Sequence, residues 1–265
     1  MITLCSYFNI ICKLDLNFKS NKMKSKILIL VALFVTSLSF SQTNPNNTYM
    51  STFVYKAKDG MVEKFEKAAE KKTKMFNKEE GSIIFTYKVL TGNNSGSYER
   101  YLVGQSNMSY DIDRSAELAY WSKNVAPYAD PVGGQVRWMW NEWGSIGDQP
   151  EPPRYLNKTV IAYKPGMEAN VNRRIYRTGK VLEKRNPNAF RRVFSPVSGA
   201  DLNIVVVFTG FDKFGRELTT SDTSWEEDYN EMFGWEQNDQ DTKMSDKSLR
   251  EYNGMTRITL EKVDW

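Results

Sequence analysis

The side chains that carry most enzyme chemistry are scarce in this chain of 265 residues. It contains no histidine, and its two cysteines, Cys5 and Cys12, lie close to the N-terminus. These absences exclude Ser-His-Asp and Cys-His nucleophilic sites, histidine-bearing zinc sites and a histidine-ligated haem. The remaining chemistry is that of Asp, Glu, Lys, Arg, Tyr, Ser and Thr side chains. We therefore predict no metal site and no cofactor.

Tryptophan is concentrated in the segment QVRWMWNEW, residues 135–143. The alternation of a strand places Trp138 and Trp140 on one face, with Trp143 just beyond. These rings could form an aromatic wall for a flat ligand or a sugar ring. Equally, Val136, Trp138 and Trp140 could simply fill the core, because aromatic side chains dominate burial.

A second candidate cluster lies in SYERYLVG, residues 97–104, where Arg100 occupies mid-strand on the opposite face from Glu99 and Tyr101. A buried arginine is costly unless it is paired, so Arg100 either binds an anionic substrate or pairs with an acid at a solvated edge. Tyr55, Tyr87 and Tyr101 are the tyrosines that could donate protons, although most buried tyrosines are structural. The candidate ligand-binding residues are thus Trp138, Trp140, Arg100, Tyr87 and Tyr101.

Acidic and aromatic residues are interleaved in residues 221–247. Asp239 and Asp241 resemble the start of a calcium loop, but Lys243 stands where a third ligand belongs and the glycine is missing. The acids at 226–228 could supply paired carboxylates for glycoside hydrolysis, although adjacent acids usually form a solvated helix face. The composition favours a loop over a pocket mouth or a partner-binding surface.

The elements that position these residues occur twice. YKAKDGMVEKFEK (55–67) is echoed by YKPGMEANVNR (163–173), so that Gly60-Met61 aligns with Gly166-Met167. Alternation and helical spacing around both phrases predict the order strand, helix, two strands, helical region and strand. The first half comprises strands at 50–57, 82–90, 97–104 and 135–143, a helix at 61–77 and a helical region at 109–128. The second comprises strands at 158–163, 189–196, 202–209 and 255–263, a helix from Met167 to Leu182 and a helical region at 211–253.

The order β-α-β-β-α-β is that of the ferredoxin-like fold, and the strand LNIVVVFT (202–209) is apolar on both faces, as in a sheet covered on both sides. With the two Gly-Met helix starts, this order resembles the dimeric α/β-barrel superfamily over residues 49–265. We predict an α+β fold of two tandem ferredoxin-like repeats whose sheets pack face to face as an α/β barrel. The repeats span 49–146 and 154–265, joined by a linker at 147–153, with the acidic insert in the second.

The resemblance implies a pocket between sheet and helices in each repeat. The superfamily includes cofactor-free monooxygenases of the antibiotic-biosynthesis type, haem-degrading enzymes and haem-dependent relatives of chlorite dismutase. A fold of this breadth does not imply one chemistry. A histidine haem ligand has no counterpart in this chain.

The N-terminal part indicates export. Met23, two lysines, an apolar run and Ser39-Phe40-Ser41 are typical of a signal peptide at 23–41, with residues 1–22 as an upstream extension. Removing 1–41 takes five basic residues and one acid, which leaves 31 of each. A neutral mature chain is a poor nucleic-acid partner, and no later segment suits a membrane span. We expect a periplasmic or extracellular location.

Three functions remain open from the residues alone. The first is an exported protein that binds a small aromatic or apolar ligand in a barrel pocket. The second is a cofactor-independent monooxygenase or isomerase acting on an electron-rich organic substrate. The third is an extracellular interaction module that uses the acidic insert. Because the tandem repeat would supply its own partner, we expect a monomer with an internal pseudo-dimer.

Overall fold

The computed structural model describes residues 49–79, 81–147, 151–214 and 222–265. The predicted upstream extension (1–22) and signal peptide (23–41) lie outside the described residues. So do positions 148–150 of the predicted linker and positions 215–221 at the start of the last helical region.

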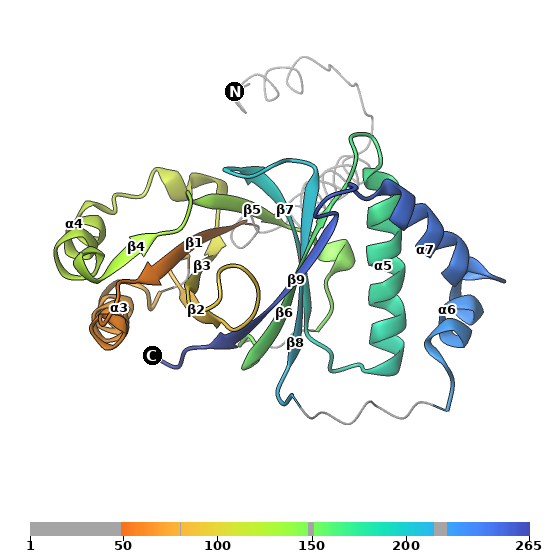
Figure 1. The fold of residues 1–265 in the computed structure, drawn as a ribbon, viewed down its shortest axis with the longest axis horizontal. Coiled ribbons are helices and arrows are strands. Elements are labelled where there is room, and N and C mark those ends of the chain that lie inside the picture. The colour runs from red at the N-terminus through yellow and green to blue at the C-terminus, as the bar shows by residue number, and fades with distance from the viewer. Residues whose placement is uncertain (1–48, 80, 148–150, 215–221) are drawn as a thin grey trace, which may run out of the picture. The chain divides into compact units, whose positions relative to one another are not determined.

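The described part of the chain contains nine strands and five α-helices (Figure 1). The strands are β1 (Tyr49–Ala57), β2 (Ile84–Val89), β3 (Tyr98–Gln105), β4 (Ala129–Pro131), β5 (Val136–Trp140), β6 (Tyr155–Ala162), β7 (Arg191–Ser198), β8 (Ile204–Phe211) and β9 (Met255–Lys262). The α-helices are α3 (Val62–Phe76), α4 (Ser115–Asn124), α5 (Glu168–Arg185), α6 (Trp225–Phe233) and α7 (Gln237–Ser248). The predicted elements are all present, with ends that differ by a few residues.

Eight of the strands close into an antiparallel barrel in the order β3-β2-β9-β6-β8-β7-β5-β1, and the β1–β3 pairing completes the circle. The short strand β4 pairs with β1. The two halves of the chain join edge to edge, through β2–β9 at one seam and β5–β7 at the other. Closure leaves no barrel strand with an unpaired edge. The expected packing of two sheets face to face is therefore realised as one continuous barrel.

The core has three parts: one fills the barrel interior, and two lie between the outer faces of the strands and the helices. On β8, Val206 and Phe208 point into the barrel with Leu260 of β9, whereas Val205 and Val207 pack outward against α5. This split confirms the expectation that the strand is buried on both faces. A third cluster, built around Phe65 of α3, fills the space between the first half's strands and α3 and α4.

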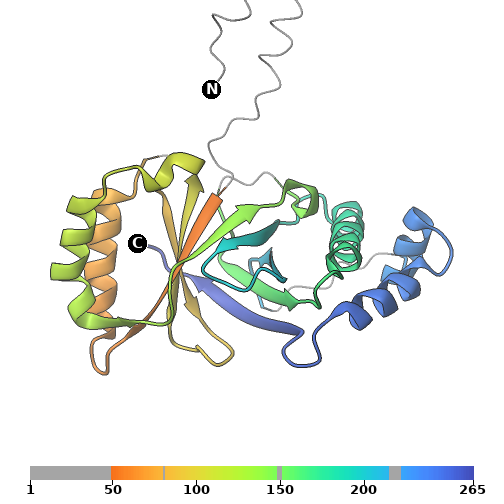
Figure 2. The same ribbon diagram turned by 90° about the horizontal axis from the view of Figure 1, so that it is seen from above.

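Helices cover the outside of the barrel unequally, as Figures 1 and 2 show. Helices α3 and α4 lie over the first half, and α5 lies over the second, with α6 and α7 on the far side of α5. The predicted helical region 211–253 is thus two helices, separated at Gly234 (φ 111°).

The helical structure of α7 removes the calcium-loop interpretation. Asp239 pairs with Lys243 one turn along α7. Asp241, on the same helix, is only 2% exposed. The acids at 226–228 lie in the first turn of α6, where Glu227 completes a capping box with Ser224. The helices α6 and α7 also contribute no residue to the barrel cavity described below, so the described part of the insert is not a loop over that mouth.

The α6–α7 pair is held on α5 largely by charge. Asp241 accepts from Arg177 at 2.6 Å and from the Tyr229 hydroxyl at 2.8 Å, and lies 3.2 Å from Nε of Arg173. The side chains of both arginines are partly exposed, which weakens each pair through solvent screening.

Replacing Asp241 with Asn should lower the free energy of unfolding by about 2 kcal/mol, because it removes charge-assisted hydrogen bonds at a buried carboxylate. The matched change Asp239→Asn, two residues away at an exposed pair, should cost less than about 0.5 kcal/mol. Urea unfolding measures both changes. Hydrogen exchange should accelerate across α6 and α7 in the first variant alone, and equal effects of the two changes would contradict this docking.

Candidate functional site

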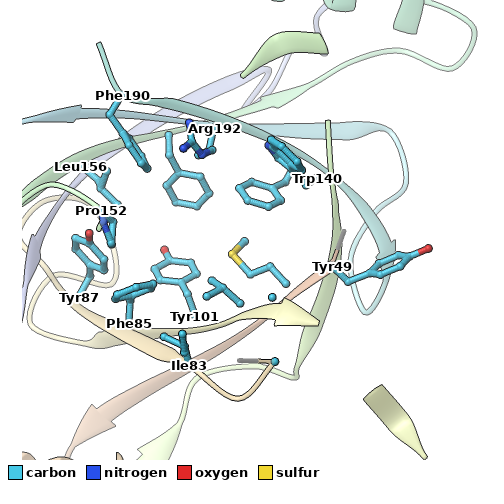
Figure 3. A pocket seen from close by; sticks show the side chains of 16 residues that line it. Tyr49, Ile83, Phe85, Tyr87, Tyr101, Trp140, Pro152, Leu156, Phe190 and Arg192 are labelled. Atoms are coloured by element: carbon cyan, nitrogen blue, oxygen red, sulfur yellow. The ribbon is translucent and has the colours of Figure 1, made fainter. Parts of the chain in front are cut away.

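A cavity of about 470 Å³ lies inside the barrel, with walls from both halves of the chain (Figure 3). An eight-stranded barrel is just wide enough to be filled by side chains or to hold one small ligand. In this chain the side chains leave one end unfilled. The aromatic lining residues are Tyr49, Phe85, Tyr87, Tyr101, Trp140, Phe190, Phe194 and Phe208.

Strand alternation explains why these side chains meet. Residues two apart point to the same face, which brings Phe85 and Tyr87 of β2 and Arg192 and Phe194 of β7 into the cavity. Figure 3 shows Phe190, Arg192 and Trp140 on one wall, facing Tyr87, Phe85, Tyr101 and Ile83 across the open space. The described lining is predominantly aromatic and aliphatic, as is usual for small-molecule sites.

Four of the lining rings form a continuous edge-to-face row. The ring centroids of Tyr87 and Tyr101 are 6.0 Å apart, those of Tyr101 and Phe208 5.4 Å, and those of Phe208 and Phe194 5.8 Å. Interplanar angles of 70° to 86° are in the range that aromatic pairs prefer. The row crosses from the first half of the chain to the second, so that the two halves together form a single aromatic surface.

The phenol groups of this row are hydrogen-bonded at the cavity wall. The Tyr87 hydroxyl donates to the Pro153 carbonyl oxygen at 2.9 Å, and that of Tyr101 donates to the buried carboxylate of Glu99. Glu99 also pairs with Lys158 at 2.7 Å. Burial, reinforced by the charge of Glu99, holds the pKa of Tyr101 well above its ordinary value. Burial likewise raises the pKa of Tyr87, so both phenols stay protonated at neutral pH.

Arg192 is the one charged side chain among the described residues that line the cavity. Its Nη1 donates to the carbonyl oxygens of Ile146 (2.7 Å) and Arg191 (3.0 Å), and its guanidinium lies 4.6 Å from the centroid of the Phe190 ring. These contacts fix a positive charge at the wall. Arg192 was not among the residues predicted from the sequence, although its alternation with Phe190 and Phe194 was a usable signal.

The structure brings three of the five predicted ligand-binding residues to this cavity: Tyr87, Tyr101 and Trp140. Trp138 does not reach it. Trp138 lies two residues before Trp140 on β5, deeper inside the barrel. The residue is 6% exposed, and its Nε1 donates to Thr52 Oγ1 at 2.9 Å. Trp138 therefore fills the core, as the alternative interpretation held, and Trp143 is 40% exposed beyond the strand.

Arg100 lies on the other side of the sheet. It lines a smaller pocket of about 90 Å³ between the first half's strands and the helices α3 and α4. The proposed pairing at a solvated edge is wrong, because the Arg100 side chain is 2% exposed. The resemblance implied pockets between sheet and helices, and this small pocket has that position, whereas the larger cavity lies inside the barrel.

Lys72 of α3 also lines the small pocket, and burial together with the nearby Arg100 charge lowers its pKa to about 8, even though the Glu117 carboxylate opposes the shift. Because its pKa is lower in the folded than in the unfolded chain, the cost of burying this charge is present in full below about pH 8 and is relieved as the pH rises further.

We expect the unfolding free energy of the wild type to rise, relative to that of Lys72→Met, as the pH increases from about 8 towards 10. Urea unfolding at intervals of pH measures this difference. Titration of the labelled Lys72 side chain by NMR should give a midpoint near 8. A midpoint at the ordinary value for lysine would show that Lys72 is solvated.

The described residues contain no group of three or more acidic side chains arranged to hold a metal ion. None of the described helices is long and apolar enough to cross a membrane.

No known family profile matches this sequence, and no curated protein matches it. Among solved structures, the chain is similar to a candidate monooxygenase from Fusobacterium nucleatum subsp. nucleatum, at a TM-score of 0.58 and 12% identity over 82% of this chain and 93% of that one. A candidate monooxygenase from Lactobacillus acidophilus gives 0.53 and 9% over 81% and 94%. An anthrone oxidase-like protein gives 0.48 and 13% over 84% and 93%.

At these identities the likeness shows the fold alone. The chain has a mixed α+β fold with a closed eight-stranded antiparallel barrel and five helices in its described part. In fold it is similar to these two candidate monooxygenase structures.

Proposed function

We propose that this protein binds one small, flat aromatic or apolar molecule inside the barrel. The observation that carries the proposal is the cavity of about 470 Å³ bounded by the aromatic row from Tyr87 to Phe194. Burying a flat ring between Trp140 and this row would remove apolar surface from water on both faces of the ligand. Arg192 and the phenol hydroxyls at the wall would orient any polar substituent.

We further propose that the barrel consists of two tandem ferredoxin-like repeats and that the chain is an exported monomer. The strand order β5-β1-β3-β2 in the first half has the same form as β9-β6-β8-β7 in the second, which supports a duplication. Export to the periplasm or beyond rests on the signal-like segment at 23–41. Each half supplies the edge that closes the other, so that no second chain is needed for closure.

The native mass spectrum of the chain expressed from Met23, with export intact, tests ligand binding, export and the monomeric state together. We expect a monomer that begins after Ser41 and carries a co-purified small molecule or takes up one equivalent of N-phenyl-1-naphthylamine, a neutral aromatic fluorophore. A chain that retains residues 23–41 would contradict export. A purified protein that neither carries a ligand nor shows saturable uptake of the fluorophore would contradict the binding function.

An enzymatic function is the second candidate, because the cavity wall includes a potential proton relay. The Tyr101 hydroxyl connects the cavity to Glu99, which is neutralised by Lys158. In a cofactor-independent monooxygenase, the electron-rich substrate itself would reduce dioxygen: one oxygen atom would enter the product, and the other would leave as water with the two hydrogens that the substrate loses. In an isomerase, the Tyr101 hydroxyl would return to one atom of the substrate the proton that another atom loses. Oxygen uptake with phenols and hydroquinones, compared between the wild type and Tyr101→Phe, distinguishes this enzyme from a pure binder.

A further inference from the structure

The small pocket between the first half's strands and helices α3 and α4 contains more positive than negative charge. Three basic side chains line it, Lys72, Arg100 and Arg114, and Glu117 is the single acidic side chain among its described lining residues. Lys72 and Arg100 are 4% and 2% exposed. Buried charges are normally paired, so an excess of two positive charges at one buried site requires an explanation.

Glu117 is fully engaged by two of these cations. It accepts a short hydrogen bond from the Lys72 ammonium group and lies 3.7 Å from Nε of Arg114. Burial would raise the pKa of Glu117, but Lys72 and Arg114 outweigh that effect and hold it below its ordinary value. The carboxylate is therefore ionised at neutral pH and still balances only one of the three positive charges.

Arg100 has no carboxylate within ion-pair distance in the described part of the chain. Its Nε donates to Thr86 Oγ1 at 3.3 Å and its Nη2 to Thr73 Oγ1 at 2.5 Å. The guanidinium carbon also lies 5.0 Å from the ring centroid of Trp121 and 5.7 Å from that of Trp265. Two hydroxyls and two indoles fix its position and orientation, but they supply no negative charge.

The size of the pocket limits what could supply that charge. Its volume of about 90 Å³ equals the liquid volume of about three water molecules. An anion of about four or five heavy atoms fits this space. The remaining lining residues are apolar or aromatic: Phe53, Tyr55, Ile84, Leu118 and Trp121. Apolar surroundings strengthen an ionic contact relative to bulk water. The planar donor fork of arginine matches an oxyanion better than a spherical ion.

We propose that this pocket is a binding site for a small oxyanion, recognised by Lys72, Arg100 and Arg114 and separate from the barrel cavity. The ligand class is a short carboxylate or inorganic phosphate, each of which presents two or more acceptor oxygens to the three cations. Because the site lies on the opposite face of the sheet from the aromatic cavity, it stands independently of the function proposed there.

Calorimetric titration of the full chain with sodium phosphate, sodium acetate and sodium chloride at constant ionic strength tests the proposal. We expect one saturable site per chain for phosphate or acetate, and the tighter of the two identifies the source of the oxyanion. Lys72→Met should weaken binding about tenfold or more, as expected for loss of a charge-assisted hydrogen bond. Arg114→Gln, at a partly exposed position, should weaken it similarly and tests the site if Lys72→Met does not fold.

The matched control is Lys71→Met, which removes the same charge from an exposed position one residue away on α3. It should leave the affinity within about twofold, because exposed charges contribute little. The Nε–H signal of Arg100 in NMR spectra should shift on saturation with the oxyanion. Absence of saturable binding by the wild type, chloride binding as tight as that of both oxyanions, or equal losses in the Lys71 and Lys72 variants would each overturn the proposal.

Discussion

A Lys158→Met variant is expected to lose about 3–5 kcal/mol of unfolding free energy, the largest effect of any single change proposed for this protein. Lys158 on β6 and Glu99 on β3 form an ion pair at 2.7 Å, with side chains 12% and 4% exposed. The two strands belong to different halves, so that the pair links the halves through the barrel interior. Removing the lysine leaves the Glu99 carboxylate buried with the Tyr101 hydroxyl as its one side-chain partner among the described residues.

The double variant Glu99→Leu with Lys158→Met should recover most of this loss, because replacing a buried ion pair by apolar side chains is often neutral. Urea unfolding of the two single variants and the double variant measures the coupling. Lys58→Met is the matched control: its ion pair with Asp130 is long (3.6 Å) and exposed, so that a loss under about 1 kcal/mol is expected. A cost for Lys158→Met no greater than that of the control would show that water reaches Glu99.

The second large effect is on ligand affinity. Trp140→Ala should weaken the binding of N-phenyl-1-naphthylamine by about tenfold or more, because it removes one wall of the aromatic cavity and aromatic side chains dominate such contacts. Trp140 is held in place by the hydrogen bond from its Nε1 to Ser145 Oγ at 2.8 Å. The ring is therefore preorganised against the cavity before any ligand arrives.

Trp143→Ala supplies the matched control, since Trp143 lies three residues further on, is 40% exposed and does not line the cavity. We expect its affinity for the fluorophore to stay within about twofold of the wild type. Fluorescence titration of the three proteins, with circular dichroism to confirm that each is folded, makes the comparison. An unchanged affinity in Trp140→Ala, or an equal loss in both variants, would place the bound fluorophore elsewhere.

The order of elements could be predicted because alternation and helical spacing are local properties of a sequence. Strand β8 is an example of a successful prediction from local pattern: its apolar residues on both faces correctly indicated burial on both sides. The last helical region shows the limit. Asp241 was weighed as a calcium ligand, whereas its carboxylate pairs with Arg173 and Arg177 of α5, some sixty to seventy residues earlier in the chain.

The candidate site was likewise predicted in part. Tyr87, Tyr101 and Trp140 were found because they are aromatic residues on predicted strands, and three aromatic side chains on the inner faces of a barrel meet in its interior. Trp138 was misplaced because periodicity specifies the face of a strand and not the depth along the barrel. That depth depends on the register of β5 with β1 and β7.

Composition and local spacing were enough to establish that histidine and cysteine chemistry is absent downstream of residue 41, to predict the order of the elements, and to group the residues of each strand by face. The closure of one barrel through the seams β2–β9 and β5–β7, with an aromatic cavity inside, became visible in the three-dimensional arrangement of the strands. The tertiary structure alone placed Arg100 and Lys72 around a second pocket. The physical reason is that spacing along a chain reports burial, whereas cavities and charge clusters arise from the register between segments far apart in sequence.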